Sequence, residues 1–194
     1  MKSVSEIIAF VLNCLQEKLP PGCFYHSVEH TRLVIDSCRE MAEYYLLDAA
    51  EKNILLTAAA FHDLGFTEDV KQHEDGSARL SAEYLSEWGF TRQEISAVER
   101  LIMVTKRSGK PLDLISQIIS DADLSYLGKD KGQIDFWRNA LYREISFFNS
   151  SLTGERWHEI EYKFIKDLFF YTSFAQEKYE PGRQLILAEY TTGR

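Results

Sequence analysis

Two histidines four residues apart open a long apolar-periodic stretch, in a chain that has only five histidines. His26 and His30 stand in the segment YHSVEH, which follows a Pro-Pro-Gly turn. A third histidine, His62, stands beside Asp63 in AAAFHDLGF, at the end of another apolar stretch. Imidazole nitrogens and carboxylate oxygens bind divalent ions such as Zn, Mn, Fe, Co, Ni or Mg, depending on geometry. These residue types raise the hypothesis of a metal site, provided that the fold brings the segments together.

Two further carboxylates, Asp121 and Asp123, occur in the segment SDADLSYLG. A helix turns about 100° per residue, so residues two positions apart cannot both face one pocket. Ile119 and Leu127, four positions either side of Asp123, are apolar, whereas the residues at the same spacing from Asp121 are polar. We therefore expect Asp123 to face inward and to be the ligand. A bend in the helix would instead let Asp121 reach the ion.

Each of these features also has an ordinary structural explanation. A lone inward histidine is more often a satisfied core residue than a ligand. A single His-Asp dipeptide carries almost no information, and an aspartate of SDAD could cap a helix. Inward histidines, a His-Asp pair at a helix end and an inward aspartate occur together in this chain. Their combination makes a metal site about as good an explanation as ordinary core and cap residues.

The elements that must position these residues are helices. Apolar residues recur at three- to four-residue spacing almost throughout, alternating strand patterns are absent, and no repeat of fixed period appears. The sequence therefore predicts an all-α bundle. The predicted helices cover about residues 3–18, 26–46, 48–61, 77–88 and 112–127. Another begins after Thr91, which is a plausible N-cap with Glu94 as its capping-box partner. Two longer C-terminal helices follow, separated by NSSLTG.

The second predicted helix places its histidines on the buried side. His30 shares a face with Val34, Cys38 and Met41 and so points inward. His26 falls one turn earlier on the same side.

Composition and length set the wider class. The chain has 194 residues, 45% apolar and 27% charged, which predicts one globular domain over residues 1–194. No apolar run approaches the roughly 20 residues that span a bilayer. The first residues lead into an amphipathic segment with Glu6, which is atypical of a secretory signal peptide. Three cysteines without C-x-x-C spacing indicate neither a disulfide framework nor a zinc knuckle, so we expect a cytoplasmic protein without membrane contact.

The formal net charge of −8 argues against a broad nucleic-acid-binding face. It does not exclude a small phosphorylated substrate, because a metal ion in a pocket supplies positive charge locally.

Four segments taken together, YHSVEHTRLV, AAAFHDLGF, HEDGSA and ISDADLSYLG, resemble the HD-domain superfamily of metal-dependent phosphohydrolases. The resemblance covers about residues 24–130, and the closing FYTSFAQEKYEPGRQLIL resembles the C-terminal helices, about 131–190, of small stand-alone members. It implies a single HD-domain helical bundle that holds one divalent ion, whether Mn, Ni, Co, Mg, Zn or Fe. The implied ligands are His30, His62, Asp63 and one aspartate of SDADL, which the resemblance to the phosphodiesterases places at Asp123.

The same resemblance implies the chemistry. YHSVEH is similar to the Y-H-x-x-x-H element of cyclic-nucleotide phosphodiesterases in the superfamily, in which the first histidine donates a proton. His26 is then the general acid for the leaving group. Asp63 could also act as a base for the attacking water, and Lys106 in TKRSGKP is our candidate for phosphate binding, against the ordinary reading of a solvated loop lysine. The expected activity is hydrolysis of a nucleotide or another small phosphate ester.

His73 bears on the number of ions. HEDGSA is not the HExxH motif, which excludes a zincin protease. Dinuclear members of the superfamily use additional histidines between the HD pair and the last aspartate, and His73 could be one, but a matching second histidine is missing. We favour a mononuclear site, with His73 touching substrate or lying behind the ligands.

Two alternatives to a hydrolase remain: a non-catalytic nucleotide-sensing HD module and an oxygenase of the dinuclear-iron HD type. The complete ligand set together with His26 favours the hydrolase. A homodimer also stays open, because the aromatic segments DFWRNALY and KDLFFYTSF could form a dimer face, although we prefer to place them in the core.

Overall fold

The computed structural model describes residues 1–192, and in that range the chain forms helices and no strand, which confirms the expected all-α fold. The elements in chain order are α1 (Val4–Lys18), α2 (Val28–Tyr44), α3 (Ala49–Phe61), the 3-10 helix η1 (Leu64–Thr67), α4 (His73–Glu87), α5 (Arg92–Met103), α6 (Leu114–Ala122), the 3-10 helix η2 (Ser125–Gly128), α7 (Lys131–Phe148), α8 (Gly154–Asp167), α9 (Ser173–Lys178) and α10 (Glu180–Thr192).

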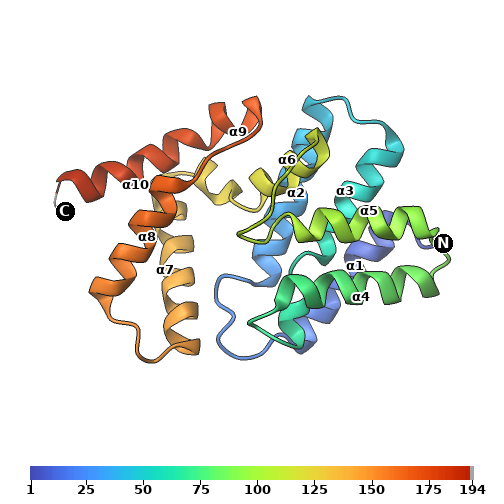
Figure 1. The fold of residues 1–194 in the computed structure, drawn as a ribbon, viewed down its shortest axis with the longest axis horizontal. Helices are drawn as coiled ribbons and strands as arrows, with labels where there is room; N and C mark the ends of the chain where they lie inside the picture. The colour runs from blue at the N-terminus through green and yellow to red at the C-terminus, as the bar shows by residue number, and fades with distance from the viewer. Residues whose placement is uncertain (193–194) are drawn as a thin grey trace.

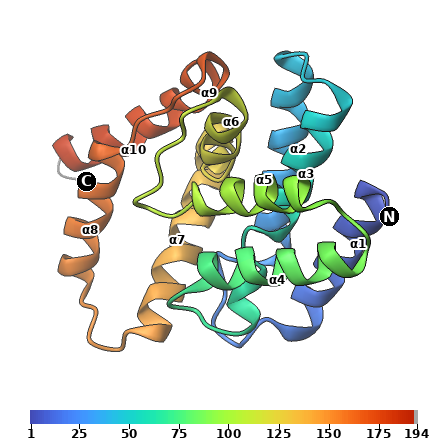
Figure 2. The same cartoon turned by 45° about the vertical axis from the view of Figure 1, so that its right-hand side comes forward.

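Helix α3 is the centre of the N-terminal part. Its residues from Leu55 to Phe61 are all buried, as expected for a helix that is apolar all round. It contacts α1, α2 and α5, while α4 packs along α5 (Figures 1 and 2). The C-terminal helices α7 to α10 gather at the other end of the molecule, and α2 and α6 lie between the two groups (Figure 1). Helix α3 therefore carries its last residues, and the His-Asp pair after them, into the middle of the fold.

Side-chain caps fix where several helices begin. Thr91 and Glu94 form the predicted capping box at the start of α5, so that prediction is confirmed. Ser3 and Glu6 do the same for α1, and Asp48 and Glu51 for α3. Because the caps satisfy backbone N–H groups that a helix leaves unpaired, they set the starting residue of each helix.

Two helix starts near the site differ from the prediction. Helix α2 begins at Val28, because the Ser27 side chain caps it by accepting from the His30 N–H; His26 therefore lies before the helix and not one turn along its face. Helix α4 begins at His73 and not at Ser77. Its first turn carries Glu74 and Asp75, which the positive end of the helix dipole favours.

The C-terminal part contains more breaks than expected. Helix α6 ends at Ala122, and the chain continues through η2, so the predicted stretch 112–127 is not one helix. In place of two C-terminal helices the described chain has four, with the predicted break at NSSLTG between α7 and α8. The further break comes at residues 168–171, which are not helical, before Thr172 caps α9.

The placement of both aromatic segments in the core was only half correct. Trp137 and Phe170 are buried, but Phe136 is 60% exposed and Phe169 is 64% exposed.

None of the described helices combines the length and apolar character needed to cross a membrane.

Candidate metal centre

The structure brings together His30, His62, Asp63 and Asp123, the four residues proposed from the sequence as ligands. His30 lies in the first turn of α2, His62 directly follows α3, and Asp123 directly follows α6. At Asp63 the backbone leaves the helical conformation (φ −108°, ψ 4°), so the two neighbours His62 and Asp63 turn their side chains to the same point. Three of the four side chains therefore come from helix C-terminal ends.

The Nε2 atoms of both histidines lie close to a carboxylate oxygen of each aspartate. His30 Nε2 is 3.0 Å from Asp123 Oδ1 and 3.5 Å from Asp63 Oδ2. His62 Nε2 is 3.1 Å from Asp63 Oδ2 and 3.5 Å from Asp123 Oδ1. The two histidine Nε2 atoms are themselves 3.4 Å apart. Each imidazole nitrogen thus lies within 3.5 Å of an oxygen from both aspartates.

This spacing fits a divalent ion. Ligands at about 2.1 Å from an ion lie about 3.0 Å apart at octahedral edges and about 3.4 Å apart at tetrahedral edges. His62 Nδ1 is 2.8 Å from the Ala59 carbonyl oxygen, a contact that places the proton on Nδ1 and leaves a lone pair on Nε2. Asp63 Oδ2 is buried and has no hydrogen-bond partner among the described residues. A buried carboxylate oxygen that faces two imidazole nitrogens without a hydrogen bond is well suited to a metal.

The electrostatics of the cluster are strongly coupled. Burial raises the pKa of Asp63, but the charges of His62 and His26 outweigh it, so this pKa lies below its ordinary value. Burial also raises the pKa of Asp123, and its hydrogen bonds to His30 and His62 reverse that effect. Burial lowers the pKa of His62, but the charge of Asp63 and the hydrogen bond to Asp123 outweigh this effect, so the pKa lies well above its ordinary value. Without an ion, protonated imidazole compensates the negative charges of the two carboxylates. A bound cation can supply that positive charge in place of the imidazole protons.

His26 lies beside this cluster and is held by a residue that the sequence analysis did not identify. The buried Glu144 carboxylate accepts from the backbone N–H groups of Tyr25 (2.9 Å) and His26 (3.0 Å) and also bonds to His26 Nδ1. Nε2, the other ring nitrogen of His26, has no hydrogen bond with any residue in the range 1–192. Burial lowers the pKa of His26, but the charge of Asp63 and the hydrogen bond to Glu144 outweigh it, so the pKa is raised. Glu144 shares the buried face of α7 with Trp137 and Ala140, and an acid on an apolar face was the signal that could have revealed it.

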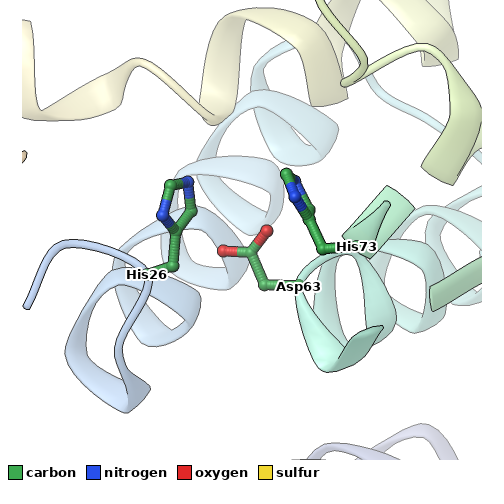
Figure 3. A group of neighbouring side chains, drawn as sticks. All are labelled: His26, Asp63 and His73. Carbon is green, nitrogen blue, oxygen red and sulfur yellow. The ribbon is translucent and has the colours of Figure 1, made fainter. Parts of the chain in front are cut away.

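A second group of possible ligand atoms shares Asp63 with the first. His26, Asp63 and His73 each present one such atom within 4.8 Å of the others. Figure 3 shows the Asp63 carboxylate between the two imidazole rings. The Phe66 ring stacks against both histidines, at centroid distances of 4.2 Å and 4.0 Å.

The position of His73 depends on a close approach of η1 to the first turn of α4. A Cβ at Gly65 would lie 2.0 Å from the His73 carbonyl oxygen, so only glycine fits there. The Gly65 N–H also donates to Ser77 Oγ at 2.7 Å. His73 is thus held beside Asp63 by backbone packing.

A cavity of about 510 Å³ opens beside both groups, and Asp63, Asp123, His26 and His73 line it. Lys106 lines it too, but its Nζ is 2.6 Å from Asp75 Oδ2, so its charge is already paired. A volume of this size is typical of small-molecule sites.

The reason given for excluding Asp121 was wrong. Its side chain does not face outward; it is buried and accepts from the Tyr171 N–H (3.0 Å) and from the N–H and hydroxyl of Thr172 (2.8 and 2.7 Å). It does not belong to either group of ligand atoms. Asp121 is therefore buried and Asp123 is partly exposed, and the two face different partners.

Comparison with known proteins gives one match. A family model described as the HD domain matches residues 27–125. No curated protein and no solved structure matches the chain.

Proposed function

Because the chain belongs to the HD-domain superfamily of metal-dependent phosphohydrolases, we propose that it hydrolyses a phosphate ester of a nucleotide or of another small compound. His30, His62, Asp63 and Asp123 would hold one divalent ion. The observation that carries the proposal is the convergence of four ligand atoms beside a cavity that His26 also lines.

The ion, when bound, lowers the pKa of a coordinated water and polarises a phosphoryl oxygen. A water molecule that has given one proton to solvent forms the new oxygen–phosphorus bond as the bond from phosphorus to the ester oxygen breaks. His26 donates a proton from Nε2 to that ester oxygen, and Glu144 holds the ring through Nδ1. The carboxylate of Glu144 favours the protonated form of His26, so the ring can carry the proton that it donates.

Asp63 and Lys106 have supporting roles in this proposal. The lowered pKa of Asp63 makes its carboxylate a weak base, so we assign it mainly to the ion. Lys106 would leave Asp75 to bind a phosphoryl oxygen, which limits its contribution because an existing ion pair is lost.

A second candidate, the dinuclear-iron oxygenase, is supported by the second ligand group. If His26 and His73 bound a second ion through Asp63, His26 could not be the proton donor. Metal analysis separates the two functions: two irons per chain support the oxygenase, whereas one ion supports the hydrolase. A non-catalytic sensor would bind its nucleotide and release no phosphate.

The test is a phosphate-release screen over nucleotides, cyclic nucleotides and sugar phosphates. Cyclic substrates require a phosphatase in the assay, since opening a cyclic ester releases no free phosphate. The protein is stripped of metal, and Mn, Ni, Co, Mg, Zn and Fe are added back singly. We expect turnover with at least one metal and none with the stripped protein. No turnover with any metal, in protein that binds one ion per chain, would overturn the proposal.

A further inference from the structure

Two exposed aromatic side chains line the same cavity on the segment between α8 and α9. Leu168 and Thr172 have extended backbone, and exposure alternates between them, with Phe169 and Tyr171 on the exposed side and Phe170 on the buried side. Phe170 is 2% exposed and belongs to the core, while Phe169 is 64% exposed and Tyr171 is 37% exposed. Both exposed rings face the cavity. We call Phe169 and Tyr171 the aromatic wall.

Buried hydrogen bonds hold this wall in place. Asp121 accepts from the Tyr171 N–H and from both the N–H and the hydroxyl of Thr172, at 2.7 to 3.0 Å. Thr172 also caps α9 by accepting from the Ala175 N–H. An exposed loop with a buried carboxylate beneath its backbone is ordered, and ordered exposed aromatic rings are a feature of binding sites.

The shape and polarity of the wall indicate what it would bind. The two rings lie 5.4 Å apart at 89°, so they offer a flat face and an edge at right angles. The Tyr171 hydroxyl makes no hydrogen bond to any described residue, and it is free to meet a polar group. A flat ligand with a polar edge fits this corner, and nucleobases have that form.

The loop across the cavity supplies a positive charge. Arg107 lines the cavity, is exposed and makes no ion pair with any residue in the described range. Its charge reaches Asp167 at the end of α8. The pKa of Asp167 is lowered mainly by a hydrogen bond from Lys163, and the charge of Arg107 lowers it further. An anionic group between the metal centre and this arginine would be favourably placed.

We propose that the aromatic wall is the base-binding part of a nucleotide site, with the base stacked on Phe169, the Tyr171 hydroxyl at its polar edge and the phosphate directed to the metal centre. The direction of the phosphate rests on the proposed function. The wall itself does not, since it lies outside the residues that match the HD-domain model.

Binding of two phosphonates to the metal-loaded full chain tests this without turnover. One is the analogue of adenosine 5′-monophosphate and the other that of ribose 5-phosphate, which lacks the base. Phe169→Ala is compared with Phe136→Ala, which removes an equally exposed ring on α7 that does not line the cavity. Calorimetry measures the dissociation constants.

We expect Phe169→Ala to weaken binding of the adenosine analogue about 5- to 150-fold, the range for loss of one base–aromatic stack. Binding of the ribose analogue should not change, and Phe136→Ala should change neither. Tyr171→Phe, which keeps the ring, should lower affinity for the adenosine analogue only a few-fold. Equal binding of both analogues by the unmodified protein, absent binding of the adenosine analogue, or an unaffected Phe169→Ala variant would overturn the base site.

The two proposals can fail separately. If Phe169 controls adenosine binding but no phosphate is released in the screen, the base site stands and the hydrolase falls. If phosphate is released and Phe169 has no influence on affinity, the hydrolase stands and the base site falls.

Discussion

The two sides of the cavity are built in opposite ways. On the metal side, charged and titratable groups that proteins rarely bury are buried together, as with His62 and Asp63. On the aromatic wall, a ring that proteins usually bury is exposed, as with Phe169. Each side breaks the ordinary relation between residue type and burial, and in each case a bound group would remove the cost: a cation for the first, a flat apolar surface for the second.

One helix end supports both sides. At the end of α6, Asp123 turns toward His30 and Asp121 turns toward the backbone of residues 171 and 172. The two side chains point to different sides because residues two positions apart on a helix lie about 200° apart around its axis, and Asp123 still has helical backbone angles. A shift of this helix end would move a metal ligand and the base of the aromatic wall together.

The largest expected effect is on the metal side. Replacing His62 by Ala removes one of four ligands, and we expect most of the metal and all turnover to be lost with helical content largely intact. Metal is measured by elemental analysis and helical content by circular dichroism. His158→Ala, an exposed histidine on α8, is the matched control and should keep both metal and activity. Unchanged metal content in His62→Ala would remove the proposed centre.

The two aspartates separate the sides most clearly. Asp123→Ala should lose the ion and all turnover. Asp121→Ala should keep most of its metal, because its carboxylate belongs to neither ligand group, but it leaves three buried or partly buried donors unpaired at a cost of about 1–3 kcal/mol each. Its unfolding midpoint should fall, and its binding of the adenosine phosphonate should weaken.

Metal analysis, thermal unfolding and the same calorimetry measure these effects. Loss of the ion from Asp121→Ala in folded protein, with retention in Asp123→Ala, would reverse the assignment of the ligand.

Much of the metal side could be anticipated from sequence, because ligand chemistry restricts residue type and all four residues stand in short motifs. The burial of Asp121 could not, because the polar residues four positions either side of it indicated an exposed face, whereas the backbone of residues 171 and 172 covers that face. Glu144 was missed since it acts across 118 residues of sequence on His26. The aromatic wall was missed for a different reason: in LFFYTSF the exposed Phe169 and the buried Phe170 are of the same residue type, so the sequence alone does not distinguish them.

His26 should matter for rate and not for metal. As proton donor, its replacement by Ala should lower kcat about 10²- to 10⁴-fold with one ion per chain retained. If the variant loses an ion from a protein that holds two, His26 is a ligand of the second group with His73.

Glu144→Gln should have a smaller effect of the same kind. The amide can still accept from the Tyr25 and His26 N–H groups, but it cannot stabilise a protonated imidazole as the carboxylate does. We expect a loss of about 10- to 100-fold in kcat, with the basic limb of the pH–rate profile shifted to lower pH, because the pKa of His26 falls when the charge is removed. A reduced rate with an unchanged pH profile would indicate that Glu144 has only a packing role.

The smallest effect is expected for Lys106, which lies on the loop between the two sides. Its ion pair with Asp75 is exposed to solvent and contributes little to stability, so Lys106→Ala should leave the unfolding midpoint nearly unchanged. If the lysine binds a phosphoryl oxygen, KM should rise by about 10-fold or less, since the ammonium group must first leave Asp75. Lys110→Ala is the control, because this lysine is exposed on the same loop and does not line the cavity. Equal kinetics for the two variants would make Lys106 an ordinary loop lysine, and the phosphate would then depend on the metal centre and Arg107.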